Sequence, residues 1–177
     1  AQTVFDDMVD HGVEPNVVTY STLIKVFGDA GQPDRAESVF EQMRDNAISP
    51  NPVAYNSLIK VLSEDDRLDE ALDLYRDMRD RDIAPDVVTY STLIHAFGES
   101  GQPGRAAELF EEMQRVGVTP NDYTFNTLIK AFGDAGDPMR ALDAYREMQE
   151  AGVQPDEITY TNLISAFYRA GQYEKAI

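Results

Sequence analysis

Apolar residues recur along this chain every three or four positions, the spacing of one face of an α-helix. In residues 17–51 this spacing occurs in two separate runs, and we expect Gly28 and Gly31 to end the first. Pro33 follows them and suits the first turn of the second run, where a backbone N–H is not needed. Two helices joined by a short turn are therefore predicted. Their apolar faces are Tyr20, Leu23, Ile24 and Phe27 in the first helix and Ala36, Val39, Phe40 and Met43 in the second.

The same pattern returns every 35 residues over the whole chain. Three residue types keep this step without a slip: Pro15, Pro50, Pro85, Pro120 and Pro155; Ala36, Ala71, Ala106, Ala141 and Ala176; Met8, Met43, Met78, Met113 and Met148. A fixed period of this length is typical of solenoids, in which each unit buries its apolar face against its neighbours. The sequence predicts one all-α repeat array over residues 1–177. Its full units are 17–51, 52–86, 87–121 and 122–156; a partial unit at 1–16 supplies a second helix, and another partial unit covers 157–177.

Apolar stripes at corresponding positions predict the first helix of each later unit. They are Tyr55, Leu58, Ile59 and Leu62; Tyr90, Leu93, Ile94 and Phe97; Phe125, Leu128, Ile129 and Phe132; and Tyr160, Leu163, Ile164 and Phe167. Because the first and last units are incomplete, we expect the chain to be part of a longer array.

Composition narrows the possible functions. The 177 residues are 42% hydrophobic, which is enough for a folded core. The absence of cysteine excludes disulfides, thiolate nucleophiles and cysteine-based zinc sites. No run reaches the roughly 18 apolar residues of a membrane span, so no membrane partner is expected. The net charge of −17 argues against a general binder of polyanions, whose usual signature is a basic surface.

The repeated unit resembles the pentatricopeptide repeat family, in its P-type form with uniform units of 35 residues. The resemblance rests on V-V-T-Y-[SN]-[TS]-L-I, then A-G, then [RE]-A-x-x-x-[FY]-x-x-M and I-x-P-[DN], and it covers the whole chain. The tetratricopeptide repeat has a period of 34 residues and a signature tryptophan, and this chain contains no tryptophan. The resemblance implies a right-handed superhelical α-solenoid of antiparallel helix pairs, similar to tetratricopeptide arrays.

Members of that family bind single-stranded RNA with one repeat per base. The resemblance implies that the fifth and last residues of each unit select the base. The pairs are Ser21 with Asn51, Asn56 with Asp86, Ser91 with Asn121, and Asn126 with Asp156. A small hydroxyl with Asn is linked to adenine and Asn with Asp to uracil, which implies 5′-AUAU-3′. Asn16 and Thr161 would extend the site, Asn16 leaving A or C open and Thr161 favouring a purine.

The residues themselves support a base-binding face. The second, fifth and ninth residues of a unit are spaced i, i+3 and i+7, so they share one side of the first helix. They combine an apolar residue, a short polar residue and usually a cation, which can contact the face, the edge and the phosphate of a nucleotide. The apolar set is Val18, Val53, Val88, Tyr123 and Ile158, and the backbone-binding set is Lys25, Lys60, His95 and Lys130.

Each of these residues has a plainer interpretation. Asn51, Asp86, Asn121 and Asp156 could simply cap helices, the valines could pack between units, and the lysines could be a solvated surface. Carboxylates also stand where the family often has a lysine, before the Ala-Gly that ends the first helix. These are Asp29, Glu64, Glu99 and Asp134, with only Arg169 basic. Such carboxylates repel phosphate, so they favour the alternative of a protein-interaction scaffold, such as a peripheral subunit of an organellar ribonucleoprotein.

Enzyme activity is not predicted. His11 and His95 are the only histidines and lie far apart, so neither a metal site nor a cofactor is expected. We interpret the acidic cluster Glu64, Asp65, Asp66, Asp69 and Glu70 as structural, because it lies at a turn and a helix start, where carboxylates favour the macrodipole. The expected partners are single-stranded RNA and possibly other organellar RNA-processing or ribosomal proteins, without a small-molecule substrate. The resemblance alone places the protein in the mitochondrion or the chloroplast.

Overall fold

The computed structural model describes residues 2–172 and residue 174, and this part of the chain contains only helices as regular elements. Most helices have 13 residues, and the first has nine. They are α1 Gln2–Asp10, α2 Val17–Asp29, α3 Pro33–Asp45, α4 Pro52–Glu64, α5 Leu68–Asp80, α6 Val87–Glu99, α7 Pro103–Arg115, α8 Asp122–Asp134, α9 Pro138–Glu150 and α10 Glu157–Arg169. No helix in the described ranges is long and apolar enough to cross a membrane. Ala176 and the end of the predicted unit 157–177 lie outside the described residues.

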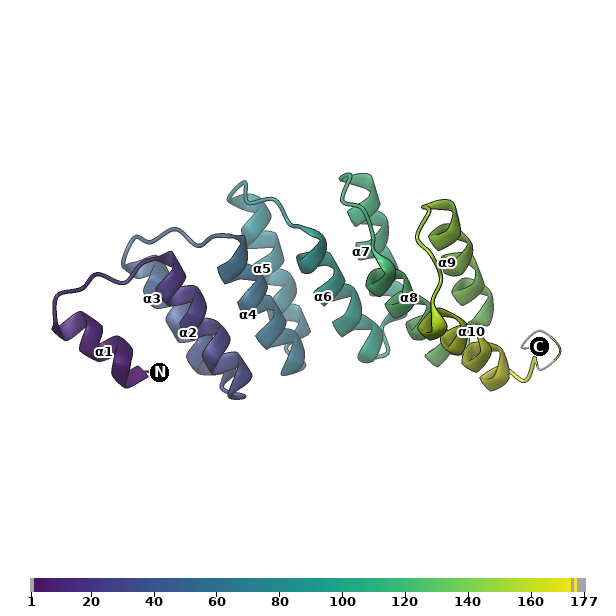
Figure 1. The fold of residues 1–177 in the computed structure, drawn as a ribbon, viewed down its shortest axis with the longest axis horizontal. Helices are drawn as coiled ribbons and strands as arrows, with labels where there is room; N and C mark the ends of the chain where they lie inside the picture. Colours follow the sequence, from purple (N-terminus) through teal and green to yellow (C-terminus); the bar gives the residue numbers. More distant parts are fainter. Residues whose placement is uncertain (1, 173, 175–177) are drawn as a thin grey trace. The chain divides into compact units, whose positions relative to one another are not determined.

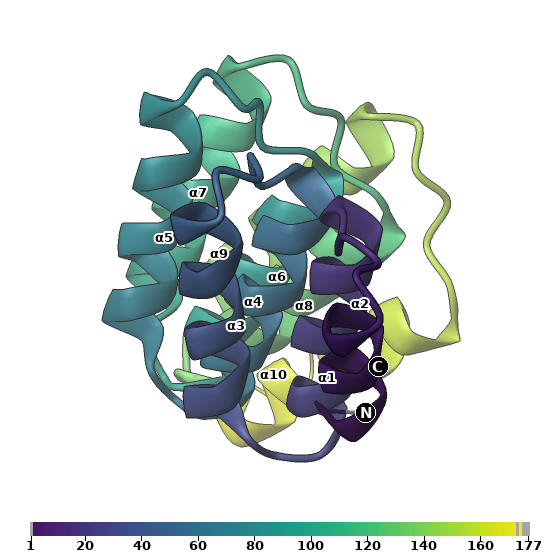
Figure 2. The same ribbon diagram turned by 90° about the vertical axis from the view of Figure 1, so that its left-hand side faces the viewer.

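The chain forms two compact units, residues 1–89 and residues 90–177. In the first unit, α2 packs on α3 and α4, and α4 packs on α3 and α5 (Figure 1). Figure 2 shows these helices from one end, with α2 to the right of α3 and α4 to the right of α5. In the second unit, α8 packs on α7, α9 and α10, and α9 also contacts α10. First and second helices thus alternate in the chain, and α2 and α8 each pack on their own second helix and on another first helix of the same compact unit.

The predicted apolar stripes form the core of both units. The small alanine and the methionine of the second helices are fully buried: Ala36, Ala71, Ala106, Ala141, Met43, Met78, Met113 and Met148. The tyrosine or phenylalanine that opens each stripe is also buried in α2, α4, α6 and α8. Aromatic contacts connect successive helices, since the rings of Phe40 and Tyr55 meet edge to face at 5.1 Å and those of Phe110 and Phe125 at 5.3 Å.

The prediction for the last stripe was partly wrong. Leu163 and Phe167 of α10 are buried, but Tyr160 and Ile164 are exposed. In the full units the residues at these two positions are buried. Within the described residues no second helix follows α10, so this part of its apolar face is uncovered.

The role predicted for Gly28 was also wrong. Gly31 has a φ of +64° and follows the helix end as expected, but Gly28 lies inside α2. A Cβ atom on Gly28 would lie 2.1 Å from Cγ2 of Val61 on α4. The missing side chain therefore allows two first helices to approach closely. Gly133 plays the same part in the second unit, where its Cβ would lie 2.8 Å from the Cβ of Ala166.

Candidate functional site

Each first helix exposes one large apolar residue at its second predicted unit position. The exposed fractions are 66% for Val18, 59% for Val53, 52% for Val88, 49% for Tyr123 and 59% for Ile158. This exposure argues against the interpretation that the valines pack between units. Within each compact unit these exposed apolar side chains are possible contacts for flat apolar ligands.

In the first compact unit, Asn56 and Asp86 are joined by a hydrogen bond although they are 30 residues apart. The amide Nδ2 of Asn56 donates to Oδ1 of Asp86 at 3.1 Å. Thr89 completes the group, because its hydroxyl donates to Oδ1 of Asn56 at 2.6 Å and its backbone N–H donates to Oδ1 of Asp86 at 3.0 Å. The fifth residue of one predicted unit, its last residue and the third residue of the next unit thus form one polar network.

The second compact unit repeats this network. Asn126 donates to Asp156 at 3.2 Å, and Thr159 donates to Oδ1 of Asn126 at 2.6 Å. The backbone N–H of Thr159 is the main cause of a lowered pKa of the Asp156 carboxyl group; the Thr159 hydroxyl, 2.9 Å away, and the Asn126 amide add to it. Asp156 is therefore an ionised acceptor at neutral pH.

The two serine positions are arranged differently. Ser91 is buried, and its hydroxyl lies 2.7 Å from the hydroxyl of Thr124, which in turn lies 2.8 Å from Oδ1 of Asn121. Ser21 is also buried, but it donates to the backbone carbonyl of Val17 at 2.7 Å.

The last residue of each predicted unit caps the following helix. Side-chain oxygens of Asn16, Asn51, Asn121 and Asp156 accept from backbone N–H groups in the first turn, and Asp86 does the same for Thr89. The capping interpretation is confirmed. Capping occupies one side-chain oxygen and leaves the amide nitrogen of an Asn, or the second oxygen of an Asp, for another contact. Thr161, the fifth residue of α10, is exposed.

A cavity of about 430 Å³ in the first compact unit brings many of these residues together. Val53 and Val88 line it with Asn56 and Asp86, and the lysines Lys25 and Lys60 of α2 and α4 border it as well. An apolar pair, a donor–acceptor pair and two cations thus surround one space, which has the size of a small-molecule site. Asp29 and Glu64 also line it, so the cavity carries charges of both signs.

Carboxylates pair with some of the predicted backbone-binding cations. Lys60 lies 3.5 Å from Glu64. Lys130 donates to Glu99 at 2.5 Å and lies 3.3 Å from Asp134; the hydrogen bond to Glu99 is the main cause of the raised pKa of Lys130. The His95 ring instead contacts the Tyr123 ring in a tilted arrangement, with an interplanar angle of 42° and centroids 5.7 Å apart. An anionic ligand would have to compete with these carboxylates for the lysines.

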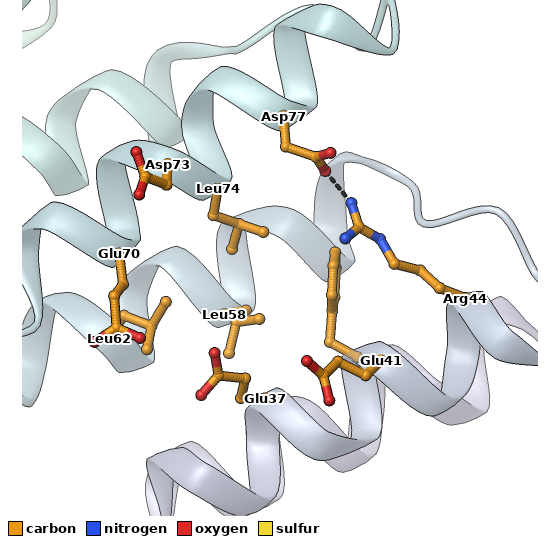
Figure 3. Close-up of a pocket in the computed structure, with 10 residues that line it drawn as sticks. Glu37, Glu41, Arg44, Leu58, Leu62, Glu70, Asp73, Leu74 and Asp77 are labelled. Carbon is orange, nitrogen blue, oxygen red and sulfur yellow. Dashed lines mark hydrogen bonds and ion pairs between the residues drawn. The ribbon is translucent and has the colours of Figure 1, made fainter.

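A second cavity, of about 280 Å³, has a different character (Figure 3). Leucines of α4 and α5 form its apolar wall, and carboxylates of α3 and α5 surround it: Glu37, Glu41, Glu70, Asp73 and Asp77. Arg44 is the one basic residue in its lining, and it forms an ion pair with Asp77. This charge disfavours a polyanion as a ligand of the second cavity.

Arg67 pairs with one member of the acidic cluster at residues 64–70, Glu70, and with two carboxylates of α3. Its guanidinium donates to Glu37 at 2.7 Å and to Asp34 at 3.1 Å, and it also pairs with Glu70. This pairing lowers the pKa of the Glu70 carboxyl group. Within the described residues, no group of three or more His, Asp or Glu side chains could hold a metal ion. The arrangement supports the structural interpretation of the cluster.

Thr89, Thr124 and Thr159 were missed as site residues in the sequence. The signal was present, because threonine recurs as the third residue of the predicted units and only Ala54 breaks the series among the full ones. A threonine at this point in a first turn is readily explained by capping. Only the packing of successive helices shows that it also contacts the preceding unit.

Comparisons with known proteins match the whole array. The sequence model described as the pentacotripeptide-repeat region of PRORP matches residues 1–140, and that of the PPR repeat family matches residues 124–169. A comparison with curated protein sequences finds no match.

Solved structures share the helix-pair solenoid. The pentatricopeptide repeat protein PPR10 from maize is 26% identical, with a TM-score of 0.89 over 99% of this chain and 25% of its own. The same maize protein in complex with an 18-nt psaJ RNA element has a TM-score of 0.82, with 26% identity over 99% of this chain and 26% of its own. The PPR domain of Arabidopsis thaliana protein-only RNase P 1, in complex with tRNA, shares the fold at 19% identity and a TM-score of 0.73, over 86% of this chain and 82% of its own. This chain spans about a quarter of the length of the maize protein.

Proposed function

Because this chain belongs to the pentatricopeptide repeat family, we propose that it binds single-stranded RNA selectively, with one base per repeat. The observation that carries the proposal is the cavity between α2 and the start of α6, where Val53, Val88, Asn56 and Asp86 line one space. The maize relative in complex with an RNA element supports the choice of ligand.

Each element of the cavity has a role toward a nucleotide. A base inserts between the exposed side chains of Val53 and Val88, which cover its two faces. Asn56 and Asp86 contact its hydrogen-bonding edge, since within the described chain the second amide hydrogen of Asn56 and Oδ2 of Asp86 are not used by the network. Lys25 and Lys60 attract the phosphates.

The proposed core sequence is 5′-AUAU-3′, read from the unit at residues 17–51 to the unit at residues 122–156. The two Asn–Asp pairs offer an N–H donor and a carboxylate acceptor, which complement the O4 acceptor and N3–H donor of uracil. The two Ser–Asn pairs offer a hydroxyl and an amide, which suit the amino group and N1 of adenine. Four bases are few for a unique transcript, so a longer array would be required for full selectivity.

The consequence of binding is passive. The protein covers an RNA segment, blocks nucleases or prevents a hairpin, and thereby affects RNA processing, stability or translation. We place this function in a mitochondrion or a chloroplast, as for the family, and assign no catalytic step to this chain.

Fluorescence anisotropy tests the proposal directly. A labelled RNA with AAUAUA in an unstructured flank is compared with one in which GCGCGC replaces it. We expect selective binding of the first RNA, weakened by salt because lysines contact phosphates. The double variant Ser21→Asn with Asn51→Asp should shift the preference at the first core base from A to U. Equal and negligible binding of both RNAs at low salt would overturn the proposal.

An interaction scaffold is the second candidate function. The carboxylate-lined cavity of Figure 3 and the net charge of −17 favour it, because both suit a basic protein surface better than RNA. The same anisotropy experiment separates the two functions, since a scaffold has no reason to prefer AAUAUA over GCGCGC.

A further inference from the structure

A buried threonine at the start of a first helix contacts the polar residue that the preceding unit offers to a base. Thr89, Thr124 and Thr159 are fully buried, so their hydroxyl groups must be hydrogen bonded within the protein. Their partners are Asn56, Ser91 and Asn126, each 33 residues earlier in the chain. The contact is therefore a repeated feature, present in both compact units.

In the asparagine units the threonine fixes the orientation of the amide. Thr89 donates to Oδ1 of Asn56, and Asp86 accepts from Nδ2 of the same amide. The same hydroxyl also lies 3.1 Å from Oδ1 of Asp86, but its donation to Oδ1 of Asn56 matches the amide orientation in which Nδ2 donates to the carboxylate. A flipped amide would place its oxygen against the Asp86 carboxylate. The remaining N–H of Asn56 is then available as a donor, while its oxygen accepts from Thr89 and keeps one further lone pair.

In the unit that contains Ser91, the threonine hydroxyl accepts a hydrogen bond from the residue of the preceding unit instead of donating one. Oδ1 of Asn121 accepts from Thr124, so the single hydroxyl proton of Thr124 is used there. Ser91, 2.7 Å away, must then donate its own proton to Thr124, because two hydroxyl groups need one donor between them. What Ser91 retains for a ligand is a lone pair, which is an acceptor.

We propose that Thr89, Thr124 and Thr159 are positioning residues that set the hydrogen-bond polarity offered to each base: a donor from asparagine and an acceptor from serine. This inference rests on the proposed function. It predicts that the threonine separates U from C in the asparagine units, since cytosine presents a donor and an acceptor in the reverse order of uracil. In the unit that contains Ser91, the threonine separates A from G. Adenine presents an amino donor at position 6 and an acceptor at N1, whereas guanine presents an acceptor at position 6 and a donor at N1.

Ala54 supplies a natural exception. It occupies the position of the threonine that would face Ser21, and Ser21 donates to the carbonyl of Val17 instead. Nothing at Ala54 directs the hydroxyl of Ser21, so the first core base should be discriminated less sharply than the third. The fold accepts alanine at this position, which makes Thr124→Ala a suitable variant beside the valine substitutions.

The test measures base preference at single positions. Wild type, Thr89→Val and Thr89→Ser are titrated with RNAs that carry U or C at the second core base or at the fourth. We expect a wild-type preference for U of about tenfold at both positions, the value of one well-placed buried hydrogen bond. Thr89→Val should reduce it to about threefold at the second base, because Asp86 still accepts from N3–H of uracil, while Thr89→Ser should retain it. The fourth base, served by Thr159, is the internal control for folding and binding.

Two results would overturn the inference. One is an unchanged preference for U at the second base in Thr89→Val; the other is an equal loss of preference at the fourth base, which would indicate a general structural effect. Thr124→Ala provides a second arm, since it should lower the A-over-G preference at the third base to the level of the first. Failure of wild type to bind any of these RNAs would instead overturn the proposed function, together with the inference that depends on it.

Discussion

Gly133 of α8 lies directly against Ala166 of α10, so closely that a Cβ atom on the glycine would come within 2.8 Å of the Cβ of Ala166 and 3.3 Å of its Cα. Because the Cα of Ala166 belongs to the backbone, rotation of a side chain cannot relieve this contact. The spacing of these two first helices therefore depends on the absence of one methyl group.

We predict that Gly133→Ala destabilises the protein by about 1–3 kcal/mol, the usual cost of overpacking, despite the better helix propensity of alanine. Gly104 in α7 is the matched control, because nothing lies within 4 Å of its added Cβ. Gly104→Ala should stabilise by about 0.5–1 kcal/mol. Urea unfolding of the two variants measures both changes, and effects of the same sign would contradict the packing argument.

The pairing of Lys130 with Glu99 and Asp134 predicts that the wild-type surface is partly self-neutralised toward RNA. Glu99→Gln should free Lys130 for a phosphate and raise the affinity for the AAUAUA RNA by about three- to tenfold near 0.1 M salt, with a steeper salt dependence. Glu111→Gln changes the net charge equally on α7, away from this pair, and should have a much smaller effect. Equal gains in the two variants would indicate a general charge effect.

Val88 is predicted to bind RNA rather than to stabilise the fold. Its side chain is 52% exposed, so Val88→Ala should change the free energy of unfolding by no more than about 0.5 kcal/mol. The same substitution removes a surface from the base cavity and should weaken RNA binding by about 1 kcal/mol. Val116 has the same exposed fraction but does not line the cavity, and Val116→Ala should leave both quantities unchanged. Anisotropy and urea unfolding together decide between the two roles.

Asp77 should make stability depend on acid pH. Burial opposes its ionisation, but hydrogen bonds from Tyr55 and Arg81 and the charge of Arg44 outweigh this effect and lower its pKa. A lowered folded-state pKa contributes stability above the unfolded value, and the contribution is lost as the pH falls through the folded value. Asp77→Asn should therefore cost about 1–2 kcal/mol at pH 7 and progressively less below about pH 4.

The control for this measurement is Asp73→Asn, because the ion pair of Asp73 with Arg76 is exposed. Its cost should stay below about 0.5 kcal/mol at both pH values. A cost for Asp77→Asn that remains constant down to pH 2 would contradict the titration argument.

The sequence by itself determined the family, the helices and most of the core, because each depends on local spacing. Residues at i, i+3 and i+4 share a helix face whatever surrounds them, and Pro33, Gly31 and the capping Asn51 act within one turn. The exposure of Val53 was not determined in this way, because the sequence also allowed the valines to pack between units.

The tertiary structure decided what depends on contacts between units. A glycine such as Gly28 is typical of a helix end, but in the structure it lies where α2 closely approaches Val61 of α4. Only the tertiary structure shows this contact. In the sequence Lys130 is interpreted as a cation available to RNA, but in the structure it pairs with Glu99, 31 residues earlier. In the sequence Thr89 is explained by helix capping, but in the structure its hydroxyl also donates a hydrogen bond to Asn56 of the preceding unit. In each case the partner lies about one repeat away, and a periodic sequence shows that such partners exist without showing which side chains touch.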